Sequence, residues 1–167
     1  MANEMTQNDI KKIEEEIEYR KLVVRKEAIE AVKEARAQGD LSENFEYYAA
    51  KRDKNKNESR IRYLERLIKN ANIIEDDTKE DEVGLFSVVE LYFEEDDDTM
   101  TVKLVTSIRG DSMKGNISID SPLGSAIKGH KVNDRIYIKV SDDYGYYVVI
   151  KSIEQTTDDG SDDIRSY

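Results

Sequence analysis

The first 75 residues contain no proline and a single glycine, Gly39, and this feature most constrains the fold. Glu, Lys, Arg and Ala, all good helix formers, dominate the same stretch. Because proline and glycine commonly end helices, the stretch predicts two long helices separated by one turn at Gly39 and Asp40. Two helices joined in this way form an antiparallel hairpin, and a helix of about 30 residues is about 45 Å long.

Apolar residues recur at helical spacing with a slight drift before the turn, and a heptad pattern after it predicts that the hairpin is a coiled coil. Lys54 and Asn57 interrupt the seam, and Lys51 to Arg60 contains no apolar residue. This stretch is therefore either a weakly packed coiled coil with solvated charges or a polar arm that need not pack on its own domain. The seam positions are Ile10, Ile13, Ile17, Val24, Ala28, Val32 and Ala35 before the turn, and Tyr47, Ala50, Lys54, Asn57, Ile61, Leu64, Ile68 and Ala71 after it.

The second half predicts a small antiparallel β-sheet with one short helix, so the chain as a whole is of the α+β class. An acidic linker, residues 76–81, separates the hairpin (1–75) from this domain (82–155), and a polar acidic tail (156–167) is expected to be disordered. Ser121, Pro122 and Gly129 mark the ends of the helix. The predicted strands are Leu85 to Phe93, Met100 to Ser107, Asn116 to Asp120, Arg135 to Val140 and Tyr146 to Ile153.

Charge is distributed unevenly between the two halves. The chain has 26 Lys and Arg against 37 Asp and Glu, a net charge of −11. Residues 1–75 carry 16 of each sign, so the whole deficit lies in residues 76–167. An acidic chain binds phosphates poorly, and any nucleic-acid contact is expected on the neutral half. No cysteine, membrane-length apolar run or signal peptide is present, which predicts a cytoplasmic protein.

Two carboxylates, Asp40 and Glu43, lie three residues apart at the turn. On a helix this spacing places both on one side, with Cβ atoms about 5–6 Å apart. One reading is structural, because Asp-x-x-Glu at a helix start is a capping-box pattern with Asp40 as the cap. The other is catalytic, and spacing alone favours the cap. Elsewhere, His130 has no nucleophile partner, and Glu94 to Asp98 lacks the spacing of a calcium loop.

The turn closely resembles the tip motif of the GreA/GreB family of bacterial transcript-cleavage factors. The residues that carry the resemblance run from Gly39-Asp40-Leu41-Ser42-Glu43-Asn44 through Glu46-Tyr47 to Ala49-Ala50-Lys51. A looser match covers Ile117-Ser118 and the segment from Ser121 to Gly129, which is similar to the family's S-P-x-G-x-A-x-x-G-K. Residues 10–154 are covered in all.

The resemblance implies a factor that is not itself an enzyme. Its coiled coil would enter the secondary channel of bacterial RNA polymerase, and its FKBP-like C-terminal domain would dock at the channel rim. Asp40 and Glu43 would help hold the second Mg²⁺ of the polymerase and orient a water, so that the polymerase cleaves backtracked nascent RNA near its 3′ end. Mg²⁺ prefers oxygen ligands and often takes one or two carboxylates from a protein. The expected factor is a monomer with no membrane or small-molecule partner.

By position, the resemblance also implies RNA contacts from Arg36, Lys51 and Arg52. No aromatic platform interleaves these cations, which argues against base readout. Two alternatives stay open. One is a Gre paralogue that occupies the same channel and modulates or inhibits the polymerase without cleavage. The other is a prolyl isomerase that uses the FKBP-like half. The remaining tip residues implied to be structural are Gly39, Leu41, Ser42, Asn44 and Tyr47.

Overall fold

The computed structural model describes residues 3–39, 44–158 and 160–166, which form two compact units. One unit is Ile10–Ala71, and the other combines Ala2–Asp9 with Asn72–Ser166. The boundaries differ from those expected, because the first residues of the chain belong to the β-rich unit rather than to the hairpin. Among the residues described, no helix is both long enough and apolar enough to cross a bilayer.

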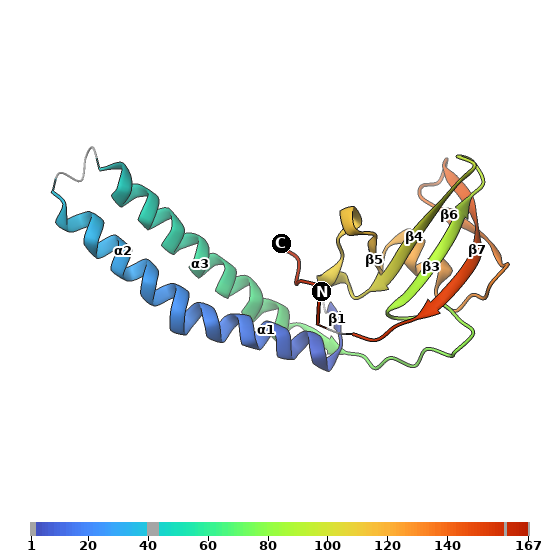
Figure 1. Ribbon diagram of the computed structural model, residues 1–167, viewed down its shortest axis with the longest axis horizontal. Helices are drawn as coiled ribbons and strands as arrows, with labels where there is room; N and C mark the ends of the chain where they lie inside the picture. The colour runs from blue at the N-terminus through green and yellow to red at the C-terminus, as the bar shows by residue number, and fades with distance from the viewer. Residues whose placement is uncertain (1–2, 40–43, 159, 167) are drawn as a thin grey trace. The chain divides into compact units, whose positions relative to one another are not determined.

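The first unit is a helical hairpin (Figure 1). Its first limb consists of α1 (Gln7–Tyr19), a π-helical turn η1 (Arg20–Val24) and α2 (Arg25–Ala37). The second limb is α3 (Phe45–Lys69), which lies alongside α2. The predicted hairpin is therefore confirmed, whereas the π turn interrupts a limb that was expected to be uniformly α-helical.

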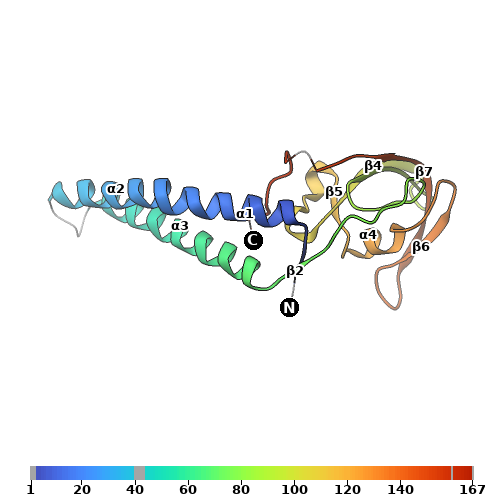
Figure 2. The ribbon, with the colours of Figure 1, turned by 90° about the horizontal axis from the view of Figure 1, so that it is seen from below.

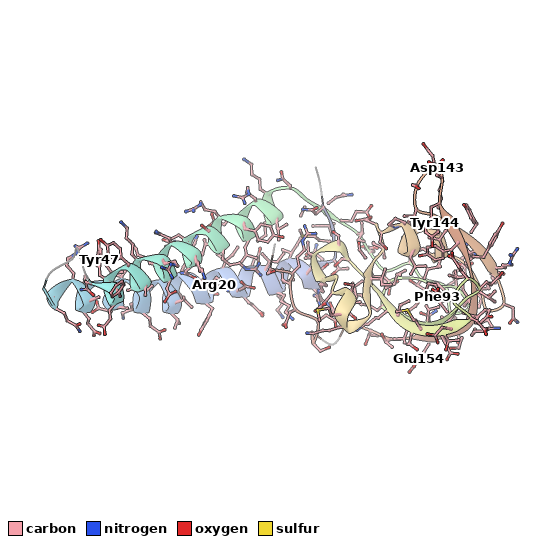
Figure 3. The ribbon with its side chains drawn as sticks, turned by 90° about the horizontal axis from the view of Figure 1, so that it is seen from above. Arg20, Tyr47, Phe93, Asp143, Tyr144 and Glu154 are labelled. Carbon is pink, nitrogen blue, oxygen red and sulfur yellow. The ribbon has the colours of Figure 1, made fainter. Side chains whose placement is uncertain are left out.

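The π turn coincides with a polar group inside the hairpin. Asn57, which interrupts the predicted seam, is only 4% exposed. Its Nδ2 donates to the backbone oxygen of Arg20 (3.2 Å), and its Oδ1 accepts from Arg20 Nη1 (3.1 Å). Figure 3 shows Arg20 partway along the hairpin. Asn57 thus bonds directly to the carbonyl of the first residue of the irregular turn, an arrangement typical of π turns held by a side chain.

The hairpin interior becomes apolar away from its tip. Ile61 and Leu64 are buried as the seam predicts, but Leu67 is buried in place of Ile68, which is half-exposed. Ion pairs also join the two limbs: Glu16 to Arg60 (2.9 Å), Lys21 to Glu65 (2.8 Å) and Arg25 to Glu58 (3.0 Å). The limbs are thus held by few apolar side chains and by paired charges.

The second unit contains a five-stranded sheet in the order β5-β4-β3-β7-β6. The strands are β3 (Ser87–Phe93), β4 (Asp98–Val105), β5 (Asn116–Ser118), β6 (Arg135–Lys139) and β7 (Gly145–Gln155). Antiparallel pairing joins β4 to β3, β3 to β7 and β7 to β6. The expectation of a wholly antiparallel sheet is wrong, because β5 runs parallel to β4. A loop with two short 3₁₀ turns, η2 (Ser107–Arg109) and η3 (Ser112–Lys114), returns the chain beside Lys103, so that β5 runs in the same direction as β4.

One helix covers one face of the curled sheet (Figure 2). This helix, α4 (Pro122–Ile127), begins as predicted: Ser121 accepts from Gly124 N (3.0 Å), and Pro122 occupies the first turn. Ile127 of α4 is fully buried against the inward side chains of the strands. These include Val89, Leu91, Val102, Leu104, Ile136, Ile138, Val148 and Ile150.

The C-terminal tail packs against this unit, in contrast to the predicted disorder. Asp162 accepts from Lys103 Nζ (2.8 Å) and from Asn116 Nδ2 (3.0 Å), and Ile164 is buried. Asp158 accepts from Arg109 Nη1 (2.9 Å). Arg109 also pairs with Asp9, which comes from the start of α1. A short two-stranded sheet of β1 (Asn3–Met5) and β2 (Ala71–Ile73) brings the chain start to the segment that leaves the hairpin.

Candidate functional site

The ends of α2 and α3 flank the candidate site at the hairpin tip. α2 ends at Ala37, and Gln38 N and Gly39 N donate to the carbonyls of Ala35 and Arg36 (3.3 and 3.4 Å). Gly39 has a φ of 117°, a conformation that L side chains rarely adopt. Glycine therefore lets the chain leave α2 at this point, as the sequence predicted.

Asn44 caps the second helix, which corrects the expectation that Asp40 does so. α3 begins at Phe45, and Asn44 Oδ1 accepts from Tyr47 N (3.0 Å). The Nδ2 of Asn44 donates to the carbonyl of Ala35 (2.6 Å), so the same side chain also ties the two helices together. Asp and Asn are about equally good caps, but only the amide can donate this second bond. The cap therefore lies four residues beyond the predicted position.

Asp40, Leu41, Ser42 and Glu43 lie outside the described residues. The predicted geometry of the carboxylate pair depended on a helix that starts at Asp40. Since α3 starts at Phe45, both carboxylates precede the helix and its cap. Their sequence positions place them between the C-terminal end of α2 and the N-terminal end of α3.

Three of the predicted tip residues come together across the two helices. The guanidinium carbon of Arg36, in α2, lies 5.7 Å from the ring centroid of Tyr47, in α3. A hydrogen bond with the Arg36 side chain lowers the pKa of the Tyr47 phenol, and the positive charge of Lys51 adds to this while desolvation opposes it. Figure 3 shows Tyr47 close to the tip. In the described part of the tip, the positively charged side chains of Arg36 and Lys51 thus lie near the ring of Tyr47.

Arg52 faces a shallow hollow on α3, with a volume of about 570 Å³. Lys51 and Lys56 line the same hollow, together with Tyr48, Asn55 and Ser59, and no carboxylate lines it. In a chain with a net charge of −11, this surface is locally positive. Lys51 therefore belongs both to the hollow and to the group around Tyr47.

Exposed aromatic rings lie beside these cations, which the sequence reasoning missed. Phe45, the first residue of α3, is 85% exposed, and Tyr48 is 48% exposed. Tyr48 packs edge-on against Tyr47, with ring centroids 5.6 Å apart. The sequence spacing could have predicted this, because Phe45, Tyr48 and Arg52 are three and four residues apart and therefore share one helix face. Exposed aromatic rings thus do lie among the cations of the tip, contrary to the expectation.

No cluster of three or more His, Cys, Asp or Glu side chains within residues 3–39, 44–158 and 160–166 is arranged to hold a metal ion. Asp40 and Glu43 lie outside these residues. If the tip contributes to a Mg²⁺ site, this carboxylate pair would supply one or two of the about six oxygen ligands, and water or another molecule would supply the rest.

Comparisons with known proteins match both halves of the chain to one family. The family model described as "Transcription elongation factor, N-terminal" matches residues 3–73. The model described as "Transcription elongation factor, GreA/GreB, C-term" matches residues 78–155. The two matches cover the hairpin and the sheet but end before the acidic tail.

Curated relatives belong to the same family as the two models. The chain is 43% identical over 137 residues to transcription elongation factor GreA of Thermoanaerobacter pseudethanolicus, which covers 81% of this chain and 87% of the relative. It is 42% identical over 135 residues to GreA of Bacillus subtilis, covering 81% and 86%. Among solved structures, GreA factor homolog 1 of Thermus thermophilus is 25% identical and covers 92% of this chain and 99% of its own, with a TM-score of 0.44. The family assignment therefore rests on the sequence matches.

Proposed function

Because this chain belongs to the GreA/GreB family of transcription elongation factors, we propose that its hairpin enters the secondary channel of bacterial RNA polymerase and stimulates cleavage of backtracked RNA. The hydrolysis would be the polymerase's own, with this chain supplying groups to its active centre. Arrested elongation complexes would then regain a paired RNA 3′ end and resume synthesis.

The observation that carries the proposal is the position of the α3 cap. Asn44 caps α3 by accepting a hydrogen bond from Tyr47 N, so neither Asp40 nor Glu43 is needed to begin that helix. Two carboxylates at the end of a hairpin are then available for another role. Carboxylate oxygens suit Mg²⁺, which in two-metal hydrolysis activates a water and stabilises the leaving oxygen. In this proposal Asp40 and Glu43 complete the weaker of the two ion sites of the polymerase.

The cations behind the tip would face the RNA. Arg36, Lys51 and Arg52 lie within a few turns of the tip, and the hollow that contains Lys51 and Arg52 is free of carboxylates. Phosphate contacts from such residues position RNA without reading its sequence. The exposed rings of Phe45 and Tyr48 offer flat apolar surfaces to unpaired bases in the same region.

The test is cleavage of labelled RNA in a stalled, backtracked elongation complex. Asp40→Asn and Glu43→Gln should each reduce cleavage by orders of magnitude, because an amide is a far poorer Mg²⁺ ligand than a carboxylate. Raising Mg²⁺ should restore part of the loss, since mass action refills a weakened site. Glu46→Gln is the matched control, because it removes one exposed carboxylate from the first turn of α3 and should leave cleavage unchanged.

Two results would count against this function. If both amide variants cleaved like the parent, the carboxylates would have no role in the chemistry. If the parent slowed transcription at the same site without producing cleaved RNA, the chain would instead be a Gre paralogue that occupies the channel and inhibits.

A further inference from the structure

A cavity of about 360 Å³ in the sheet-containing unit is formed by four chain segments that lie apart in sequence. Residues 6–8 at the start of α1 line one side, and Ile74, Glu75 and Asp76 line another. The tail contributes Thr157 and Asp158, and Phe86 completes the apolar part. The lining therefore contains three carboxylates and no Lys, Arg or His.

One of these carboxylates is buried and only half satisfied. The side chain of Asp158 is 6% exposed, and its Oδ1 accepts from Arg109 Nη1 (2.9 Å). Its Oδ2 is buried with no hydrogen-bond partner. Leaving a buried carboxylate oxygen without a donor is unfavourable, and such an atom in a native protein calls for a ligand or a solvent partner.

The charges around Asp158 do not balance. The guanidinium of Arg109 pairs with two buried carboxylates, Asp9 and Asp158. These three side chains together carry a net charge of −1. The N-terminal end of α1 adds about +0.5 and opposes a cation. Glu75 and Asp76 add −2 on the open side of the cavity, which outweighs the helix end. The lining of the cavity is therefore negatively charged.

The shape of the lining indicates what kind of cation fits. A divalent metal is disfavoured, because the described residues contain no group of three or more acidic or His/Cys side chains placed to hold one. Ile74 and Phe86 offer an apolar surface beside the carboxylates. A methylene chain packs well on such a surface while its terminal ammonium donates to carboxylate oxygens.

We propose that this cavity binds an alkylammonium group, with Asp158 as the buried anchor and Glu75 and Asp76 at the entrance. The group could be that of a free diamine or that of a lysine side chain on a protein partner. Either one would connect the α1 start, the segment after β2 and the tail, and would stabilise the sheet-containing unit by mass action.

Thermal unfolding of the full chain, followed by far-ultraviolet circular dichroism, tests the proposal with 1,4-diaminobutane as the ligand. The unfolding midpoint should rise with diamine concentration beyond the effect of NaCl or MgCl₂ at equal ionic strength. Asp158→Asn should weaken diamine binding at least tenfold and so remove most of the rise. Asp162→Asn is the matched control: Asp162 is also a tail carboxylate, but it pairs with Lys103 and Asn116 and does not line the cavity.

Asp158→Asn also weakens the pairing of Arg109, which by itself changes the unfolding midpoint. For each variant, the midpoint with diamine is therefore compared with the midpoint of the same variant without diamine. Glu75→Gln, on the exposed side of the cavity, provides a second test that leaves the buried trio intact and should reduce diamine affinity several-fold. A midpoint that follows ionic strength alone, or a full diamine effect in both Asp158→Asn and Glu75→Gln, would overturn the proposal.

Competition between the diamine and RNA polymerase for binding to the chain identifies the source of the ammonium group. If the diamine and Asp158→Asn both weaken binding of the chain to RNA polymerase, a polymerase lysine is the occupant. If polymerase binding is unchanged while the diamine still raises the unfolding midpoint, the ligand is the free diamine. Because the unfolding assay contains no polymerase, its result is independent of whether the chain stimulates RNA cleavage.

Discussion

The hairpin and the sheet-containing unit are stabilised by different means. The sheet encloses a continuous apolar core of residues that include Leu91, Leu104 and Ile150. Buried residues of the hairpin include Ile61 and Leu64, but its middle is joined by Asn57, Arg20 and ion pairs between the limbs. Polar pairs contribute less net stability than apolar burial of similar area. The hairpin should therefore open locally at lower free energy than the sheet, most easily towards its tip.

The buried ion pairs of Arg109 with Asp9 and Asp158 in the sheet-containing unit should give the largest effect. Arg109→Ala would leave Asp9 and Asp158 buried without their cation, and breaking such a buried pair costs about 3–5 kcal/mol. Urea unfolding of the full chain should show the sheet destabilised by that amount. Hydrogen exchange in α3 should stay near the parent level. A loss below about 1 kcal/mol would mean that the trio is solvated and that the contrast between the two units is overstated.

The middle of the hairpin provides the second test. Asn57→Ala removes both hydrogen bonds to Arg20, while the Arg20 carbonyl keeps its bond from Arg25 N, so we expect a loss of about 1–3 kcal/mol. Faster amide exchange confined to η1 and the facing part of α3 is the expected signature. Asn55→Ala, at an exposed position two residues away, is the control and should change exchange little.

At the tip, Asn44→Ala should cost about 1 kcal/mol, because α3 loses its cap. The bond to the Ala35 carbonyl is lost as well. The start of α3 should fray in hydrogen exchange, while the melting of the sheet is unaffected. Asn44→Asp separates the two roles: it should restore the cap but not the bond to Ala35. If Asn44→Asp were as stable as the parent, the link between the helices would carry no stability.

Acid should affect the hairpin through Glu16, with the smallest expected change. Burial raises the pKa of Glu16, but hydrogen bonds and charge from Arg60 and Arg20 outweigh it, so the pKa lies below the ordinary value of 4.5. A lowered pKa stabilises the fold at pH above the unfolded value, and the stabilisation is lost as pH falls through the folded value. Between pH 6 and about pH 3 the parent hairpin should lose more stability than Glu16→Gln, by a small amount of up to about 1 kcal/mol, measured by urea unfolding. Equal acid sensitivity of the two proteins would contradict this.

The sequence identified both helices, the short helix α4 and most strands, because periodicity and capping residues are local signals. It missed features that depend on distant partners. The π turn depends on Asn57, 37 residues from Arg20, and the ordered tail depends on Arg109, 49 residues from Asp158. The parallel pairing of β5 also has no local signal, since it depends on how the loop after β4 folds back.

At the tip, the sequence pattern predicted Asp40 as the cap, whereas tertiary contacts favour Asn44. Asp40, Ser42 and Asn44 are all good cap residues. Only Asn44 can also donate to the carbonyl of Ala35, a contact that no pattern in α3 alone reveals. Periodicity likewise predicted Ile68 in the seam where Leu67 is buried, because the seam drifts by one residue near the end of α3.

Residues 3–9 belong to the β-rich unit, so protein engineering can treat the hairpin as a replaceable module. The hairpin is an insertion, Ile10–Ala71, whose two ends both return to the same host domain. A fragment that starts at residue 76 would lack Met5 and Asp9, two fully buried side chains of that host. Exchange of hairpins between family members should therefore use junctions near residues 10 and 71. Such a chimera would keep the host domain whole while receiving a different tip.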